Sequence, residues 1–172
     1  TAVSGFAVFK DSQHRRTFDF EQGHFVAGPD ADDKRLRLDA VKELDADQED
    51  PKRYVFHYNP ELLPNRLSLS QDSAGYFNGK SNTTLIPRFS DRRSSLSGTQ
   101  ACVLEKISYP TGGCSVFRYA LSGLPDKGLV VSEIEDFDGR ETTQKRSFSY
   151  REPRGGGPEG WVTVEDVYFT TS

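Results

Sequence analysis

The sequence predicts an all-β protein made of antiparallel hairpins in an open sheet or a β-shell, and three observations support this fold class. Aromatic residues make up 12% of the 172 residues, which indicates a folded chain, because disordered chains carry few aromatic residues. Short runs of alternating apolar and polar residues recur along the chain, whereas helical periodicity is rare. Turn-forming residues separate these runs at short intervals, as they do between the strands of hairpins.

The first third of the chain contains four alternating runs, at residues 6–10, 17–20, 36–41 and 53–58. The first two runs are predicted to form the opening hairpin. The last two are predicted to form a second hairpin across the acidic turn Asp45–Pro51. A helix over residues 33–44 is the main alternative, since Leu36, Ala40 and Leu44 recur at helical spacing.

Residues 59–100 are expected to form an irregular loop. Three prolines interrupt this segment, and Asn78-Gly79 is a strong turn signal. Its polar end, residues 90–98, offers few side chains that could be buried. We therefore predict that residues 90–98 form an exposed or partly mobile loop.

The second half contains clearer hairpins, with strands predicted at residues 103–109, 115–119, 129–135, 142–150 and 161–169. The first pair turns at Pro110–Gly113, and the second turns at Asp138-Gly139, a dipeptide typical of hairpins. A Gly/Pro linker at about residues 153–160 precedes the last strand. The chain opens at Thr1 within strand-like sequence, so residues 1–172 are interpreted as one β-rich segment of a larger protein.

The two cysteines, Cys102 and Cys114, are predicted to be free thiols. Two thiols alone lack the further ligands that a metal site requires. If the Pro110–Gly113 turn centres the hairpin, Tyr109 faces Cys114 and Cys102 faces a residue near Leu121. The two sulfur atoms then lie roughly 20 Å apart along the strands, beyond the reach of a disulfide.

The charge balance argues against nucleic acid as a partner. The net charge is −4 and the isoelectric point is about 5.4, whereas a domain that binds nucleic acid usually shows a basic excess or stripe. Basic clusters at residues 34–37 and 92–93 have acidic neighbours, which indicates a mixed-charge surface. No apolar run is long enough to cross a bilayer, so we also expect no membrane span.

The chemistry of catalytic and metal sites is not evident in the sequence. His57 lies in an alternating run, which favours a position on a strand face over a role as general base. The acidic residues of 45–50 and 136–141 lie within single turns, whereas glycosidases need two carboxylates facing each other across a cleft. The run from Asp45 also departs from a calcium loop, because Asp50 stands where the loop requires Gly. We expect no catalytic residue, no cofactor and no metal site.

Exposed aromatic residues are the remaining candidates for ligand contact. Tyr76, Phe77, Trp161 and Tyr168 could stack on sugars or on a partner surface. In a β-rich fold such residues more often belong to the core or to cross-strand pairs. The strand residues expected to pack together are Tyr54, Phe56, Tyr58, Ile107, Tyr109, Phe117, Tyr119, Phe148 and Tyr150. Gly112, Gly113 and Gly139 are expected to set the turns.

An ordered set of short motifs carries a family resemblance. The motifs are Arg35–Leu38, Tyr54–Asn59, Leu63–Ser68, Gly75–Lys80, Asn82–Pro87, Leu104–Gly113 and Gly128–Val131. Together, over about residues 36–150, they resemble the segment that precedes or enters the core of RHS/YD-repeat proteins, very long secreted proteins of the Bacteroidota type. The resemblance implies a shell of β-hairpins, which encloses a C-terminal toxin in some members and serves surface contact in others.

The sequence departs from the family in features that bear on activity. It contains no aspartyl self-cleavage motif and no toxin-like tail, and Cys114 stands where the family is expected to have an aromatic residue. The resemblance therefore predicts a non-catalytic structural segment, either secreted or at the cell surface. Its expected partner is the rest of its own polypeptide or neighbouring β-subunits, and a secretion translocon or a surface glycan are further candidates. The alternative is a carbohydrate- or protein-binding β-domain of a cell-surface adhesin, which an exposed aromatic platform would favour.

Overall fold

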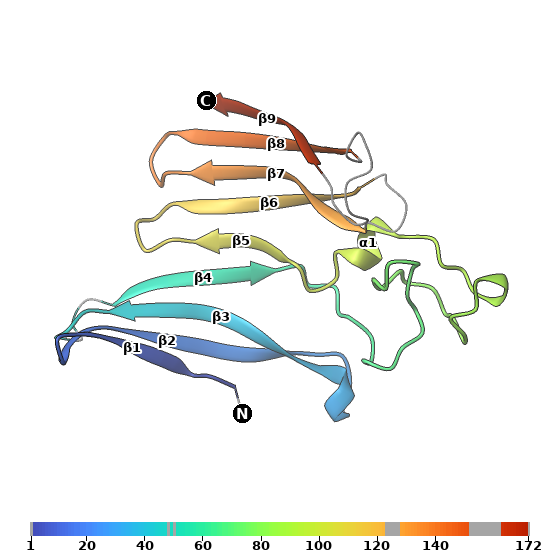
Figure 1. Ribbon diagram of the computed structural model, residues 1–172, viewed down its shortest axis with the longest axis horizontal. Helices are drawn as coiled ribbons and strands as arrows, with labels where there is room; N and C mark the ends of the chain where they lie inside the picture. Colours follow the sequence, from blue (N-terminus) through green and yellow to red (C-terminus); the bar gives the residue numbers. More distant parts are fainter. Residues whose placement is uncertain (1, 48, 50, 123–127, 152–162, 172) are drawn as a thin grey trace.

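The computed structural model describes residues 2–47, 49, 51–122, 128–151 and 163–171, and it shows one open antiparallel sheet (Figure 1). Within these residues, nine strands follow one another across the sheet in sequence order. They are β1 (Gly5–Lys10), β2 (Gln13–Val26), β3 (Lys34–Leu44), β4 (Lys52–Tyr58), β5 (Leu104–Ser108), β6 (Cys114–Leu121), β7 (Leu129–Phe137), β8 (Thr143–Arg151) and β9 (Thr163–Thr171). The predicted all-β fold class is confirmed. The predicted linker at residues 153–160 lies outside the described residues.

The helical alternative for residues 33–44 is wrong, because this segment is strand β3, paired with β2 on one side and β4 on the other. Leu36, Ala40 and Leu44 are four residues apart, and a spacing of four fits one face of a strand, where side chains repeat every second residue, as well as one face of a helix. Leu38 pairs with Gln22 and Ala40 pairs with Glu21, so the register between β2 and β3 skips one residue, Asp39, at a β-bulge.

The hairpin β5–β6 confirms the predicted strands and corrects their register. Cys114 pairs with Ser108 and not with Tyr109, whose backbone N–H instead donates to the carbonyl of Gly113 and closes the turn. Gly112 has φ +88°, a backbone conformation that glycine adopts without strain. The prediction that both cysteines are free thiols is confirmed.

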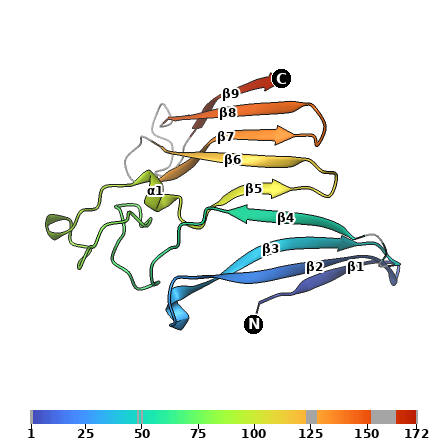
Figure 2. The same cartoon turned by 180° about the vertical axis from the view of Figure 1, so that it is seen from behind.

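The long segment between β4 and β5 lies beside one end of the sheet (Figures 1 and 2). It contains the 3-10 helix Pro87–Phe89 and the short helix α1 (Leu96–Thr99); a further 3-10 helix, Ala31–Asp33, lies between β2 and β3. The prediction of an exposed loop at residues 90–98 is only partly correct. Gly98 and Thr99 are buried, and Ser95 caps α1 by accepting a hydrogen bond from the N–H of Gly98.

Buried polar side chains hold this loop together. Asp72 has no exposed surface; its carboxylate accepts hydrogen bonds from the N–H groups of Ala74 and Tyr76, and from the hydroxyl of Ser94 at 2.6 Å. Asn78, exposed by only 1%, donates its amide to the carbonyl of Asp91 at 2.8 Å. A buried polar group is tolerated when its hydrogen bonds are satisfied, so this loop is ordered by polar contacts in place of an apolar core.

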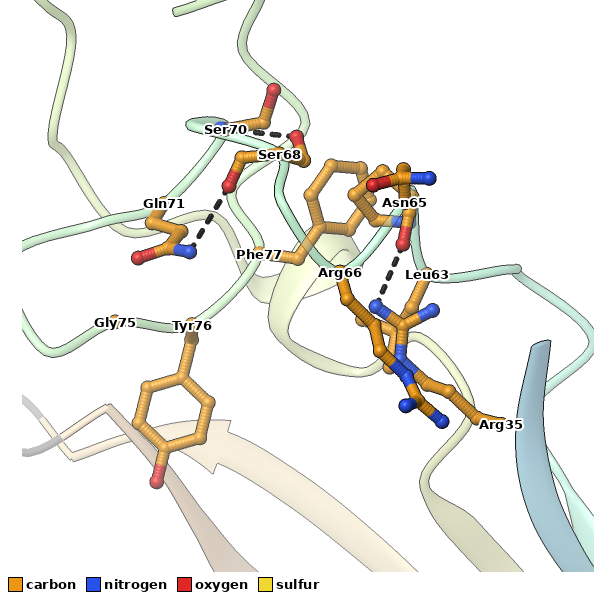
Figure 3. Close-up of a pocket in the computed structure, with 11 residues that line it drawn as sticks. Arg35, Leu63, Asn65, Arg66, Ser68, Ser70, Gln71, Gly75, Tyr76 and Phe77 are labelled. Carbon is orange, nitrogen blue, oxygen red and sulfur yellow. Dashed lines mark hydrogen bonds between the residues drawn. The ribbon is translucent and has the colours of Figure 1, made fainter. Parts of the chain in front are cut away.

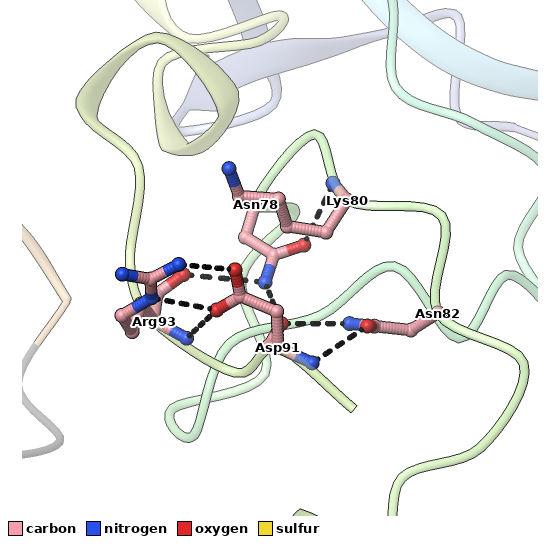
Figure 4. Close-up of polar contacts among 5 residues, drawn as sticks. All are labelled: Asn78, Lys80, Asn82, Asp91 and Arg93. Carbon is pink, nitrogen blue, oxygen red and sulfur yellow. Dashed lines mark hydrogen bonds and ion pairs between the residues drawn. The ribbon is translucent and has the colours of Figure 1, made fainter. Parts of the chain in front are cut away.

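Asp91 extends the network along the loop (Figure 4). Its backbone carbonyl accepts from the amide of Asn82 at 2.9 Å, and its N–H donates to the oxygen of the same amide at 2.9 Å. Its carboxylate pairs with the Arg93 guanidinium at 2.7 Å. That contact holds the pKa of Asp91 well below its usual range. The loop is therefore tied both through backbone atoms and through an ion pair.

The sheet has almost no enclosed core. Among the described residues, only Ala40 and Ala101 are fully buried hydrophobic residues. Seen from the front and from the back, no described helix or strand lies over either face of the sheet (Figures 1 and 2). None of the described helices has the length and the apolar character needed to cross a bilayer. The fold is thus a single layer in the part of the chain that the structure describes.

Candidate functional site

The strand register gives the sheet two chemically different faces. One of them, here called the charged face, carries Glu21, Lys42 and Arg53 on neighbouring strands. The carboxylate of Glu21 lies 2.7 Å from the ammonium group of Lys42 and 2.6 Å from the guanidinium of Arg53. These two contacts, led by the Arg53 hydrogen bond, lower the pKa of Glu21 to about 2.

A second ion cluster continues the charged face across β6, β7 and β8. The Arg118 guanidinium lies 3.0 Å from the carboxylate of Glu133 and 3.5 Å from that of Glu135. Lys145 lies 3.1 Å from Glu133. Each partly exposed pair contributes little stability, about 0–1 kcal/mol. The clusters therefore mark a face suited to contact with water.

The opposite face, here called the aromatic face, collects the strand residues that the sequence predicted to pack together. The register places on it Tyr54, Phe56, Tyr58, Ile107, Tyr109, Phe117, Tyr119, Phe148 and Tyr150. These side chains are half-buried. At the β1 end of the same face Phe6 stacks on Phe18 at 4.8 Å and remains 51% exposed. In the described structure these rings pack along one sheet surface without a second layer above them.

Three tyrosines of the aromatic face bind the backbone of the preceding strand in the same way. The hydroxyl of Tyr58 donates to the carbonyl of Leu38 at 2.8 Å. The hydroxyl of Tyr119 donates to the carbonyl of Leu104 at 2.5 Å. A third such bond, 2.8 Å long, joins the Tyr150 hydroxyl and the Val131 carbonyl. We call these contacts the cross-strand tyrosine bonds.

The three bonds occupy equivalent places in three successive hairpins, β3–β4, β5–β6 and β7–β8. When the strand pairing of each hairpin is extended, Tyr58 faces Arg37, Tyr119 faces Val103 and Tyr150 faces Val130. In each hairpin the tyrosine hydroxyl donates to the carbonyl of the residue that follows the facing residue. Each tyrosine also ends a Phe-x-Tyr tripeptide, at residues 56–58, 117–119 and 148–150. The sheet therefore contains a repeated hairpin unit, which sequence reasoning missed although the tripeptide marks it.

Burial raises the pKa of all three tyrosines above the ordinary value. For Tyr119 the carboxylate of Glu105 adds to this effect, and for Tyr58 that of Asp39 does so. A raised pKa means that the neutral hydroxyl, the form able to donate a proton, is favoured in the folded chain. The cross-strand tyrosine bonds are therefore protected against ionisation near neutral pH.

A polar chain interrupts the aromatic face at its centre. The hydroxyl groups of Tyr109 and Ser115 lie 2.9 Å apart, and Ser115 in turn donates to the carboxylate of Asp136. Arg146 pairs with Asp136 at 2.6 Å, and its buried Nε has no hydrogen-bond partner in the described structure. Sequence reasoning missed this chain, because Ser115, Asp136 and Arg146 come from three separate strands, β6, β7 and β8, and Tyr109 comes from the turn that follows β5.

A pocket of about 260 Å³ lies between the start of β3 and the long loop (Figure 3). It contains Tyr76 and Phe77, two of the predicted ligand-contact residues. Tyr76 lies on one side, and the guanidinium groups of Arg35 and Arg66 lie on the other (Figure 3). The arginines were not predicted, because they are 31 residues apart and nothing in the sequence joins them.

Of the other two predicted ligand-contact residues, Tyr168 belongs to β9, in register with Ser147, and Trp161 lies outside the described residues. His57 and Asp39 border a shallow hollow of about 390 Å³ between β3 and β4. There Asp39 pairs with Arg37 at 2.5 Å, and the His57 ring lies 3.0 Å from the hydroxyl of Ser108. No cluster of three or more metal-ligating side chains occurs among the described residues.

Comparison of the chain with protein-family models, with curated proteins and with solved structures finds no match. The fold and the site alone define the class of protein. It is a single-layer, all-β sheet built partly from repeated hairpins, with one aromatic face and a loop pocket at one end.

Proposed function

We propose that the chain is a non-catalytic structural segment of a large secreted RHS/YD-repeat protein, in which its sheet forms part of a β-hairpin shell that encloses cargo or mediates surface contact. The observation that carries this proposal is the repeated hairpin unit, with its Phe-x-Tyr tripeptide and its cross-strand tyrosine bond. A repeat of this kind adds strands to one growing sheet, and each unit gains stability from its neighbours.

The edges of the sheet support the same role. Strands β1 and β9 each pair with a neighbour on one side only in the described structure. On β1, Phe6, Val8 and Phe9 are exposed by 51%, 40% and 62%. An exposed apolar edge is a template for further strand pairing. The rest of the same polypeptide, or a neighbouring β-subunit, is the proposed partner at these edges.

The two faces fit a shell, because a shell separates two environments. The ion pairs of the charged face are suited to solvent. The half-buried rings of the aromatic face offer apolar surface that a covering layer or enclosed cargo would remove from water. Within this proposal the protein acts outside the cell or at its surface.

Light scattering over a range of concentrations tests the structural role. We expect the chain alone to associate as its concentration rises, and the double variant Val8→Lys/Phe9→Lys to shift this association to higher concentration, because charges on an edge strand oppose pairing. Circular dichroism checks that the variant keeps its β spectrum. A chain that stays monomeric throughout, with the variant unchanged, would contradict the proposal.

A second function, that of a carbohydrate- or protein-binding β-domain of a cell-surface adhesin, is favoured by one observation. Tyr76 and Phe77 line the loop pocket, and Tyr76 is 41% exposed. Binding of a ligand in this pocket by a chain that remains monomeric would favour this function over the shell.

A further inference from the structure

The loop pocket contains two cationic groups that lack carboxylate partners. Arg35 donates from Nη2 to the carbonyl of Pro64 at 2.7 Å, and Arg66 donates from Nη2 to that of Lys34 at 2.8 Å. Within the described structure neither guanidinium forms an ion pair. Asp33, an acidic residue close by, is engaged by the Asn65 amide and by the N–H of Asp30. Both guanidinium groups therefore retain donors for an external anion.

The opposite side of the pocket is an aromatic ring held in place. The ring of Tyr76 packs directly on the backbone of Gly128, where an added Cβ would overlap the ring. The backbone N–H of Tyr76 is fixed by the buried carboxylate of Asp72 at 2.9 Å. Phe77 also lines the pocket. The pocket thus has a fixed apolar side and a cationic side.

We propose that this pocket binds an anionic sugar ring, whose carboxylate or sulfate group lies against Arg35 and Arg66 and whose ring contacts Tyr76. Arginine is suited to carboxylate and sulfate because its planar donors can form two parallel hydrogen bonds. Aromatic rings provide apolar contact for the C–H faces of a ligand. The volume of about 260 Å³ admits a single ring and is below the range of about 300–1,000 Å³ typical of drug-sized ligands. This inference does not depend on the proposed structural role.

The hydroxyl-bearing and amide side chains around the mouth fit a sugar better than an apolar acid. Ser68, Ser70 and Gln71 line the pocket. The hydroxyl of Ser70 and the side-chain oxygen of Gln71 have no hydrogen-bond partner in the described structure. They are available to the hydroxyl groups of a sugar, whereas a purely apolar acid would leave them without partners.

Titration by nuclear magnetic resonance with three probes tests the site on the whole chain. Methyl β-glucuronide supplies a carboxylate, N-acetylglucosamine 6-sulfate supplies a sulfate, and methyl β-glucoside is neutral. We expect at least one acidic probe to bind about tenfold more tightly than the neutral probe, since one charge-assisted contact separates them. The stronger acidic probe identifies the anion that the site prefers. Equal affinities for all three, or no saturable binding of either acid, would overturn the proposal.

Three variants locate the binding. Arg66→Gln should weaken the acidic probe about tenfold and leave the neutral probe unchanged, because it removes charge and little ring contact. Tyr76→Ala should weaken both probes. The matched control is Arg88→Gln, since Arg88 is an exposed arginine over the ring of Phe89 and lies outside the pocket. Circular dichroism verifies folding of each variant. If Arg66→Gln and Arg88→Gln weaken binding equally, the effect of Arg66 is a general effect of charge, and the proposed site is overturned.

Discussion

The hydroxyl of Tyr119 offers the sharpest test of the repeated hairpin unit. Tyr119→Phe removes this hydroxyl and leaves the ring on the aromatic face, so the carbonyl of Leu104 loses its donor. A hydrogen bond of this kind contributes about 0.5–1.5 kcal/mol to stability. We expect a loss of about 1 kcal/mol, which lowers the urea midpoint by about 0.5 M when the slope is about 2 kcal/mol per M.

Tyr54→Phe is the matched control, because Tyr54 lies on the same face and its hydroxyl has no hydrogen-bond partner in the described structure. Urea unfolding of both variants, followed by far-ultraviolet circular dichroism, should show a loss for Tyr119→Phe alone, with unchanged slopes. If the two variants are equally stable, the Tyr119 hydroxyl does not hold the hairpin. The inference that the repeat is a stabilising unit would then be refuted.

Four further predictions concern the cross-strand tyrosine bonds, Glu21 and the loop around Asp72. Combining Tyr119→Phe with the same change at Tyr58 and Tyr150 should give nearly additive losses in urea unfolding, because the three bonds lie in separate hairpins. The wild-type chain should also lose stability as the pH rises above 10.0, the ordinary tyrosine pKa, because the unfolded chain releases the protons of these three hydroxyls at lower pH than the folded chain. The triple variant should lose less stability over that range, and an equal loss would exclude these tyrosines as the cause. Glu21→Gln should make the stability of the chain less sensitive to acid between pH 4.5, the ordinary glutamate pKa, and about pH 2. The lowered pKa of Glu21 contributes stability that the wild-type chain loses as the pH falls through that range. An equal dependence of stability on pH in both chains would contradict this. Asp72→Asn should speed amide hydrogen exchange in residues 72–94 and leave strands β5–β8 protected, because it disrupts buried acceptors of the loop alone. Uniformly faster exchange would show that the loop is not a separate unit.

The strands were predictable from the sequence because their signals are local. Alternating runs and the Asp138-Gly139 turn identify the β7–β8 hairpin, where Gly139 adopts φ +87°. The helical alternative at residues 33–44 arose because a spacing of four residues fits one face of a strand as well as one face of a helix. The pairing of β3 with β2 and β4 decides between the two, and sequence periodicity alone does not show that pairing.

The loop and the pocket were harder to predict because their contacts join distant residues. Asn78 was interpreted only as part of a turn and Asp72 was not singled out, because their buried contacts involve the distant residues Ser94, Asp91 and Arg93. The pocket brings Arg35 and Arg66 together only because the loop folds back on the start of β3. By contrast, the Phe-x-Tyr tripeptide was available in the sequence, and counting its three copies would have revealed the repeated hairpin.

The openness of the aromatic face is the central structural feature, and hydroxyl-radical footprinting read by mass spectrometry tests it most directly. At a concentration where the chain is monomeric, we predict measurable labelling of Phe56 and Phe117, since no described element covers their rings. Phe6, exposed by 51%, is the internal reference and should label more strongly. Labelling of Phe6 with complete protection of Phe56 and Phe117 would mean that a second layer covers this face, and it would contradict the single-layer sheet.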